Sequence, residues 1–440
     1  MKIAPFRPLR YNPDRISFIS RVVAPPYDVI GEPAAQLLRE SDPHNVIRLI
    51  LGKGTEGLHT DEEYQAAAAT LSAWRRDGVL VRDAEPAIYL CEQSFPVYGE
   101  VRVRRGLLCA ALLEKSDSGG LMPHEQTRAG PRADRLRLME ACRASLSPVF
   151  GIYHDGKGVG AAAVEELATG WPLYEFRMDE VAYRVWRVSD GERIRALAQA
   201  LAREQLLIAD GHHRYETALA YRRAHRDPAV PYGRAPEDYL LLYAVSARDK
   251  GLSILPTHRL VKAPEGFDRE RFLHAVSATV LVERAPTKTP EERLARVRKL
   301  RPHSILFYAG PGEVFMLTDH RLDPLQVTMP ERAPQWRNLP VTLLHYAILE
   351  PLLGIPAASD ASDQRLLFTP DAEQVYWSVE GGRFDLAFLL PPTPVRAVEA
   401  VARAGERMPA KSTYFYPKIA SGLVIYPFED ADCVPVAATP

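Results

Sequence analysis

The chain has 440 residues, of which 46% are hydrophobic, so it can bury a large core and form two or three domains or one elaborated enzyme. Its 55 basic and 56 acidic residues give a formal net charge of -1, which excludes an overall positive field and argues against general nucleic-acid binding. Any phosphate site must therefore be local.

Helical and strand patterns alternate through the first half of the chain. Residues 61–76 predict a helix, because apolar side chains recur there on one face. Residues 87–91 and 105–112 predict two strands joined by a hairpin at 96–100, and we interpret this pair as the edge of a sheet. The other elements expected here are strands at 147–153, 182–188 and 206–208 and a helix at 191–204.

The second half continues this mixture. Strands are expected at 239–246, 304–308 and 314–317, and helices at 268–279 and 290–300. The whole pattern predicts a mixed α/β or α+β fold. We expect an N-terminal α/β region at 1–156, a core region at 157–285 and a C-terminal α/β region at 286–440.

Five consecutive polar or flexible residues follow the expected strand at 206–208. They are Asp210, Gly211, His212, His213 and Arg214. Helical spacing resumes directly after them, so Asp210 could act as a general base or metal ligand beside a helix start. The imidazoles, the guanidinium and the free N–H groups of the first helical turn could hold a phosphate. The structural alternative is an N-capping Asp210 with partly exposed histidines.

A second polar cluster occupies residues 124–135. Its candidate site residues are His124, Glu125, Thr127, Arg128 and Arg135. Together they offer an acid, an imidazole and two guanidinium groups for acid–base chemistry and phosphate contacts. Because residues 134, 135 and 138 begin a helical pattern, the alternative is a solvated loop followed by a helix cap and surface ion pairs.

Toward the C-terminus, residues 405–418 combine lysines, hydroxyls and aromatic side chains. The candidate phosphate or nucleotide ligands are Lys411, Ser412, Thr413 and Lys418, which include two of the ten lysines of the chain. The aromatic rings could stack on a base or face the core, and the lysines could reach phosphate or water. His258 and Arg259 could line the cleft as substrate-binding residues, although a loop histidine beside an arginine is more often a surface feature. No histidine pair has zinc-ligand spacing, so metal ligands are left open.

Taken together, these segments resemble the bacterial and archaeal family known as domain of unknown function 1015. The resemblance covers almost the whole chain, and its motifs occur in the expected order. They are PFRPLR at 5–10, APPYD at 24–28, HEQTR at 124–128, DR at 134–135, SPVF at 147–150, ADGHHR at 209–214, PTHR at 256–259, MPAKSTYFYPK at 408–418 and SGL at 421–423.

The run 210–214 is also similar to the signature of free-serine kinases. This resemblance implies a ParB/sulfiredoxin-like catalytic core with mixed sheets, elaborated by N- and C-terminal segments. Those kinases use an N-terminal catalytic glutamate, for which Asp28 and Glu125 are the candidates in this chain. Tyr183 stands where we would have expected a histidine.

A phosphotransferase is the leading hypothesis. It would move a phosphoryl group from ATP, ADP or pyrophosphate to a small hydroxyl compound, with free L-serine as first choice, giving O-phosphoserine. Asp28 or Glu125 would deprotonate the hydroxyl, cations at 128, 214 and 411 and the histidines at 212 and 213 would neutralise charge, and Mg²⁺ would bridge donor oxygens. The alternatives are a ParB-like nucleotide-responsive binding protein and a phosphohydrolase.

The remaining expectations concern the environment of the protein. Four scattered cysteines form no Cys-x-x-Cys pair and the chain starts without a long apolar segment, so we expect a reducing, cytoplasmic location. No run of about 18 apolar residues predicts a membrane span. The expected partner is a small-molecule substrate, without nucleic acid or membrane, and a homodimer is left open.

Overall fold

A computed structural model describes residues 1–52, 60–114, 120–125, 129–287, 289–318, 323–356 and 364–429. The chain divides into two compact units. Unit 1 comprises Met1–Met122, Thr127–Leu252 and Pro417–Pro440, and unit 2 comprises Pro123–Gln126 and Ser253–Tyr416. Each unit therefore combines segments that are distant in the sequence, whereas the sequence predicts three consecutive regions.

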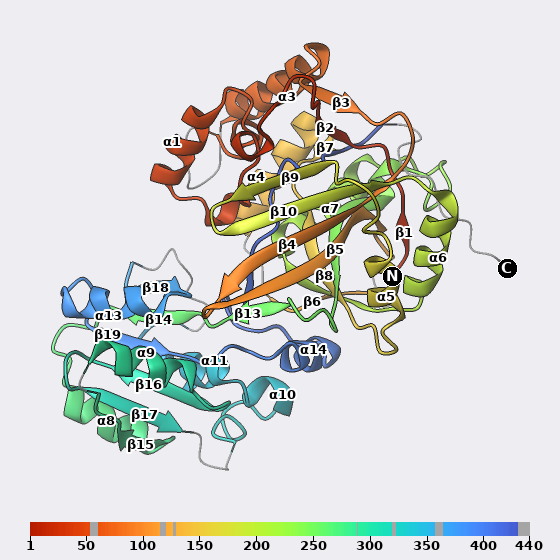
Figure 1. The fold of residues 1–440 in the computed structure, drawn as a ribbon. Helices are drawn as coiled ribbons and strands as arrows, with labels where there is room; N and C mark the ends of the chain where they lie inside the picture. The colour runs from red at the N-terminus through yellow and green to blue at the C-terminus, as the bar shows by residue number, and fades with distance from the viewer. Residues whose placement is uncertain are drawn as a thin grey trace. The chain divides into compact units, whose positions relative to one another are not determined.

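Unit 1 is built on a nine-stranded mixed sheet (Figure 1). Its strands follow the order β6-β11-β8-β12-β5-β4-β10-β9, and β1 pairs with β5 off this path. The strands are β1 (Ile3–Ala4), β4 (Ile88–Val97), β5 (Glu100–Leu112), β6 (Leu121–Pro123), β8 (Val149–Tyr153), β9 (Tyr174–Met178), β10 (Val181–Val188), β11 (Leu206–Asp210) and β12 (Tyr239–Ser246). Two short pairs also belong to this unit: β2 (Leu9–Tyr11) with β3 (Leu80–Arg82), and β7 (Ala144–Ser145) with β21 (Tyr426–Pro427).

The hairpin of β4 and β5 lies inside this sheet. Its turn is formed by Tyr98 and Gly99, which confirms the predicted hairpin. However, β5 also pairs with β12 and β4 with β10, so the prediction of a sheet edge is wrong. The reason is tertiary packing: residues 106–112 are buried on both faces of the sheet, and the missing side chain of Gly106 leaves room for the ring of Tyr243.

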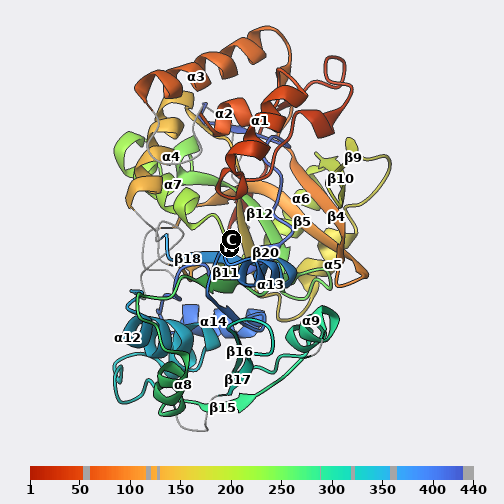
Figure 2. The same ribbon diagram turned by 90° about the vertical axis from the view of Figure 1, so that its left-hand side faces the viewer.

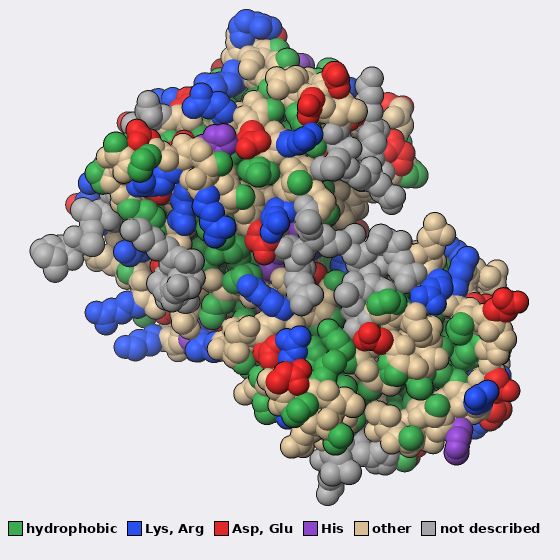
Figure 3. All heavy atoms as spheres, turned by 180° about the vertical axis from the view of Figure 1, so that it is seen from behind, with side chains coloured by type: hydrophobic (Ala, Val, Ile, Leu, Met, Phe, Trp, Pro, Cys, Tyr) green, Lys and Arg blue, Asp and Glu red, His purple; other side chains and the backbone are tan. Residues whose placement is uncertain are grey.

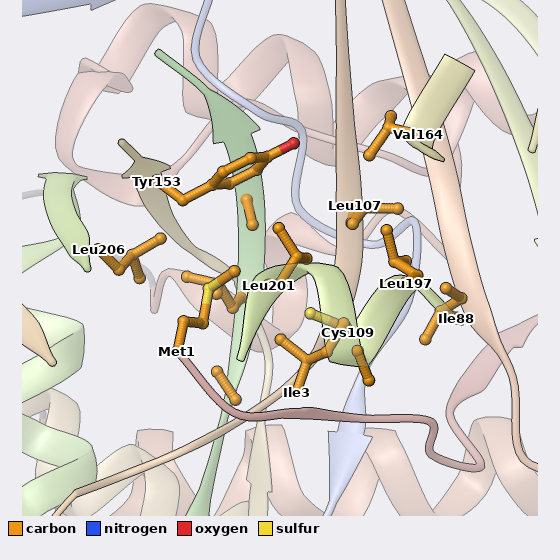
Figure 4. Close-up of a cluster of buried hydrophobic side chains, with 14 of the residues drawn as sticks. Met1, Ile3, Ile88, Leu107, Cys109, Tyr153, Val164, Leu197, Leu201 and Leu206 are labelled. Carbon is orange, nitrogen blue, oxygen red and sulfur yellow. The ribbon is translucent and has the colours of Figure 1, made fainter. Parts of the chain in front are cut away.

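Helices close the main core of unit 1. Leu197 and Leu201 of α6 point toward Leu107 and Cys109 of β5, and Met1 packs into the same cluster (Figure 4). Burying one such leucine contributes about 1.5–3 kcal/mol. The helices are α1 (Glu32–Ser41), α2 (Ile47–Ile50), α3 (Asp61–Arg76), α4 (Ala129–Cys142), α5 (Val159–Glu165), α6 (Gly191–Leu201) and α7 (His212–His225), with 3-10 turns η1 (Ile19–Arg21), η2 (Tyr27–Val29) and η3 (Pro236–Asp238).

Unit 2 contains an antiparallel six-stranded sheet in the order β15-β17-β16-β19-β14-β18. Val375 and Val379 of α13 pack on Leu260, Leu306 and Leu389 of this sheet. The strands are β14 (His258–Val261), β15 (Leu281–Arg284), β16 (Ser304–Tyr308), β17 (Val314–Thr318), β18 (Leu366–Thr369) and β19 (Leu386–Leu389), and β13 (Ser253–Leu255) pairs separately with β20 (Tyr414–Tyr416). The helices are α8 (Arg269–Ser277), α9 (Pro290–Arg298), α10 (Pro334–Arg337), α11 (Pro340–Leu343), the π-helical η4 (Leu344–Leu349), α12 (Glu350–Leu353), α13 (Ala372–Glu380) and α14 (Val395–Arg403).

The mixed α+β fold is thereby confirmed, and each unit contains both kinds of element (Figures 1 and 2). The ParB/sulfiredoxin-like core stays a prediction. Within the described ranges, no helix has both the length and the apolar character needed to cross a bilayer. The face drawn in Figure 3 carries lysine and arginine interspersed with acidic side chains, as the net charge of -1 leads one to expect.

Replacement of a core leucine tests whether the hydrophobic core of unit 1 is as described. Leu201→Ala is expected to lower the free energy of unfolding by about 2–5 kcal/mol, because it leaves a cavity at a fully buried position. Urea unfolding followed by circular dichroism measures the change. Leu37→Ala on α1 is the control: Leu37 is 69% exposed, so its loss should cost less than about 0.5 kcal/mol. Equal losses in the two variants would contradict the described core.

Candidate functional site

The chain turns from β11 into α7 at Gly211. This glycine has a φ of +84°, and a Cβ at its position would come within 2.9 Å of the guanidinium of Arg214. Glycine is therefore required by the backbone conformation and by the available space. Because Gly211 is the N-cap of α7 and has no side chain, the first N–H groups of the helix receive no capping oxygen from it. Such a helix start is suited to an anion.

Asp210, at the end of β11, holds two cations. Nη2 of Arg214 donates to Oδ2 of Asp210 at 2.7 Å, and Nζ of Lys418 donates to Oδ1. Nη1 of Arg214 also donates to the carbonyl of Pro148. We call Asp210, Arg214 and Lys418 the Asp210 cluster. Two positive charges against one negative charge leave it with a net positive charge.

The Asp210 carboxyl is ionised at neutral pH. Burial by itself would raise its pKa, but the nearby charges of Lys418 and Arg214 outweigh burial and hold the pKa well below its ordinary value. Each carboxylate oxygen already accepts from a cation, so the geometry makes Asp210 an anchor for two positive groups. The N-capping alternative is wrong, because Gly211 occupies the N-cap position of α7.

His212 and His213 are the first two residues of α7. His212 is buried, whereas His213 is partly exposed. Successive residues on a helix point about 100° apart, so the two imidazoles face different surroundings. Among the described residues, no three His, Cys, Asp or Glu side chains are grouped as metal ligands.

The backbone before Lys418 is fixed to the sheet of unit 1. Arg104 donates from Nη2 to the carbonyl of Pro417 at 2.5 Å, and Gln93 donates to the carbonyl of Lys418 at 3.3 Å. The hydroxyl of Tyr183 donates to that same carbonyl at 3.3 Å, so the residue found in place of an expected histidine supports Lys418 from β10. These bonds determine where the ammonium group of Lys418 can reach.

A cavity of about 40 Å³ adjoins Arg214 in unit 1. Its polar lining residues are Tyr27, Arg135, Ser145, Ser147, Arg214 and Thr217. The guanidinium carbon of Arg135 lies 4.2 Å from the ring centroid of Tyr27, while Arg135 also donates to the carboxylate of Asp134 at 2.7 Å. Burial raises the pKa of Tyr27 to about 12, so this hydroxyl is neutral at pH 7. Two guanidinium groups and several hydroxyls therefore face one small space.

Asp28 follows Tyr27 on the 3-10 turn η2. Its side chain is exposed, in contrast to the buried Asp210. Of the two acids predicted as a general base, Asp28 is the one that lies in unit 1.

The second predicted cluster is divided: His124 and Glu125 lie in unit 2 and contact the C-terminal segment, whereas Arg135 lies in unit 1. Nε2 of His124 lies 3.2 Å from Oγ1 of Thr413, and Oε1 of Glu125 accepts the backbone N–H of Lys411 at 3.0 Å. Oγ of Ser412 donates to the carbonyl of Pro409 at 2.5 Å. Two segments that lie almost 300 residues apart in the sequence therefore form one hydrogen-bonded group.

His258 and Arg259 lie on the buried strand β14, so the alternative of a surface loop is wrong. Nδ1 of His258 accepts the N–H of Leu390 at 3.2 Å, and burial lowers the pKa of His258 to about 3. Arg259 is 1% exposed, and burial lowers its pKa to about 9, which the charge of Glu125 only partly offsets. As placed, neither side chain reaches a surface open to a substrate.

The predicted residues thus fall into two groups. Unit 1 holds Asp28, Arg135, Asp210, Gly211, His212, His213, Arg214 and Lys418, and unit 2 holds His124, Glu125, His258, Arg259, Lys411, Ser412 and Thr413. Thr127 and Arg128 lie outside the described residues. Tyr27, Ser147 and the carbonyl of Pro148 have no predicted role, although the motifs APPYD and SPVF contain them.

A wider cavity of about 640 Å³ lies at the other end of α7 and includes none of the predicted residues. His225, the last residue of α7, lines it, so it lies roughly 20 Å along the helix from His212. Its charged lining has both signs, and Arg75 there pairs with Glu429 at 2.6 Å. We place the candidate site at the Asp210 cluster, because cations outnumber carboxylates there.

Comparison with known families agrees with the motifs. The model of one family matches residues 3–342. The chain belongs to the DUF1015 family, which is described as a protein family of unknown function. No curated protein matches the chain.

Solved structures of other proteins match the chain at low similarity. A conserved hypothetical protein from Pyrococcus furiosus is 13% identical with a TM-score of 0.36, over 70% of this chain and 92% of its own. A free serine kinase in complex with AMP is 12% identical with a TM-score of 0.35, over 74% of this chain and 90% of its own. SbnI with C-terminal truncation from Staphylococcus aureus is 13% identical with a TM-score of 0.35, over 72% of this chain and 86% of its own. Similarity at this level carries no argument about the fold or the function of this chain.

The Asp210 cluster predicts a pH-dependent loss of stability. Folding lowers the pKa of Asp210, so its contribution is complete above the ordinary carboxyl pKa of about 3.9 and is lost as the pH falls below that value. At pH 7, Asp210→Asn should lower the free energy of unfolding by about 3 kcal/mol, since it leaves two cations without their anion. Urea unfolding at pH 7, 4 and 3 should show this difference shrinking with acidity.

Asp28→Asn is the matched control, because Asp28 is exposed. It should change stability by no more than about 0.5 kcal/mol at each pH. If Asp210→Asn lowered the free energy of unfolding by the same amount at pH 7 and pH 3, the charge of the carboxylate would not be what stabilises the turn.

Proposed function

We propose that this DUF1015 protein is a phosphotransferase whose Asp210 cluster binds the phosphoryl group of the donor. The observation that carries the proposal is the surplus of positive charge on Asp210, Arg214 and Lys418, next to a helix start that Gly211 does not cap. Guanidinium and ammonium groups donate the charge-assisted hydrogen bonds that phosphate oxygens accept, and the dipole of a helix N-terminus favours negative charge.

The surplus charge is local, which is what a small phosphate ligand needs. The chain as a whole carries a formal charge of -1, so there is no broad positive field for a long polyanion. Asp210 holds Arg214 and Lys418 in place before a ligand arrives, and cations that are already positioned need less reorganisation when charge develops on the transferred group.

The proton acceptor must be a residue other than Asp210, because both oxygens of that carboxylate already accept from cations. Asp28 is our choice in unit 1, since it is exposed and follows Tyr27, which lines the cavity beside Arg214. Glu125, the other predicted candidate, already accepts the backbone N–H of Lys411.

The reaction would be an in-line transfer. An acceptor oxygen forms a bond to the terminal phosphorus of the donor, the bond from that phosphorus to the leaving oxygen breaks, and the acceptor proton passes to Asp28. Arg214 and the helix start would bind the equatorial oxygens, where negative charge is spread in the transition state. Free L-serine is the first acceptor to test, because the run 210–214 resembles the free-serine kinase signature.

Mg²⁺ fits this proposal as an ion carried mainly by the donor. Magnesium usually keeps several waters and binds through substrate phosphates and one or two carboxylates, so it needs no cage of three protein side chains. When bound, the ion would neutralise charge on the donor oxygens.

A direct assay tests the function. Purified protein incubated with L-serine, Mg²⁺ and, separately, ATP, ADP or pyrophosphate should form O-phosphoserine, detected by mass spectrometry. Arg214→Ala should lower the rate by about 10² or more if its guanidinium stabilises the developing charge. Arg195→Ala on α6 is the control, because Arg195 is exposed on a helix away from the β11–α7 turn.

Two results would count against the proposal. One is the absence of any phosphorylated product with all three donors across a panel of hydroxyl acceptors. The other is unchanged turnover in Arg214→Ala, with circular dichroism showing that the variant is folded. Phosphate release that does not depend on an acceptor would instead identify a phosphohydrolase.

A further inference from the structure

Lys411, in unit 2, has a backbone conformation that favours glycine. Its φ is +56°, in the left-handed region. An L-residue with a side chain is strained there and persists only where its surroundings hold it. Glycine would adopt this conformation without strain, so the chain keeps a lysine here at a conformational cost.

Two charged residues hold this conformation from opposite sides. Oε1 of Glu125 accepts the backbone N–H of Lys411 at 3.0 Å. Nη2 of Arg259 donates to the carbonyl of Lys411 at 3.1 Å and to the carbonyl of Ala410 at 3.5 Å. Arg259 is itself fixed, because its Nε donates to His345 at 3.1 Å. The peptide groups on both sides of the Lys411 Cα are therefore restrained.

The neighbouring residues complete the turn. The N–H of Met408 donates to the carbonyl of His124 at 2.7 Å, and Ser412 donates to the carbonyl of Pro409 at 2.5 Å. The hydroxyl of Thr393 donates to the carbonyl of Ser412 at 3.3 Å. Every one of these bonds restrains the backbone, and none of them engages the lysine ammonium group.

The side chain of Lys411 is partly exposed. In the part of the chain that the structure describes, no carboxylate lies within ion-pair distance of its ammonium, and the nearest acid of this turn, Glu125, is used on the backbone. Arg259 adds a second positive charge beneath the turn, in a buried position without a carboxylate in contact among the described residues. The turn is therefore a rigid, positively charged element.

We propose that Lys411 binds an oxyanion of a substrate, and that Glu125 and Arg259 are positioning residues that act by holding its backbone in the left-handed conformation. The ligand chemistry is a phosphoryl or carboxylate oxygen. Whether this oxyanion is a donor phosphate or an acceptor carboxylate rests on the proposed function. The binding of an oxyanion at Lys411 does not rest on it.

Replacement of Lys411 by glycine separates strain from binding. Lys411→Gly relieves the backbone and removes the ammonium, so we expect a melting temperature higher by about 2 °C and an affinity for the oxyanion weaker by about tenfold or more. Lys411→Arg keeps the charge and should bind within about threefold of the unchanged protein. Isothermal titration calorimetry with pyrophosphate and with L-serine, on the full chain, measures both affinities.

Asp179→Gly is the matched control for strain. Asp179 has a φ of +51° in the exposed turn between β9 and β10 of unit 1. Its replacement should raise the melting temperature by a similar amount, about 2 °C, and leave both affinities unchanged.

The two ligands distinguish the source of the oxyanion. Weaker pyrophosphate binding with unchanged L-serine binding identifies a donor phosphate, and the reverse identifies an acceptor carboxylate. Because binding is measured without turnover, the proposal survives even if no phosphoserine is formed. It is overturned if the unchanged protein binds neither ligand, or if Lys411→Gly binds both as well as the unchanged protein does.

Glu125 variants test the positioning role. Glu125→Gln keeps an oxygen that can accept the Lys411 N–H, so binding should stay within about threefold, and turnover, where it is observed, should persist. Glu125→Ala removes the acceptor and should weaken binding about tenfold. Abolished turnover in Glu125→Gln with binding intact would make Glu125 the proton acceptor and overturn its assignment as a positioning residue. Equal loss of binding in Glu125→Gln and Glu125→Ala would also overturn that assignment.

Discussion

The sharing of one buried carboxylate by two cations organises the candidate site. Asp210 ends a strand in the middle of the sequence, whereas Lys418 lies close to the C-terminus, and their ion pair closes a connection over more than 200 residues. Arg214 adds a contact from the first turn of α7. Without the carboxylate, two positive groups would face each other in a buried place, so the turn, the helix start and the returning segment depend on it.

In both the Asp210 cluster and the turn at Lys411, a carboxylate holds cationic residues in position. In unit 1 a carboxylate holds two cationic side chains directly, and in unit 2 a carboxylate holds the peptide N–H of Lys411 and leaves the ammonium group available. The result in each case is local positive charge in a chain that is close to neutral overall. This arrangement suits small oxyanions better than extended polyanions, because a broad positive field is lacking.

Much of the secondary structure was predictable, since it follows from periodicity. Residues 61–76, 191–204 and 239–246 carry clear helical or strand patterns, and the structure has α3, α6 and β12 there. The hairpin of β4 and β5 was predictable, but its place inside the sheet was not, because pairing with β12 and β10 joins segments that lie far apart in the sequence. The burial of Arg259 was not predicted, because a histidine beside an arginine is typical of a protein surface. Only the helices and strands that cover this dipeptide show that it is buried.

The sequence by itself determined which residue types are available and where strands turn into helices, because both follow from local composition and spacing. It therefore identified the run 210–214, the family motifs and the mixed α+β class. Only the tertiary structure decided which charges meet. It brought Lys418 to Asp210 and Glu125 to the backbone of Lys411, and it made Gly211 the N-cap in place of Asp210. Electrostatic interactions depend on distance and burial, and neither quantity can be obtained from the order of residues along the chain.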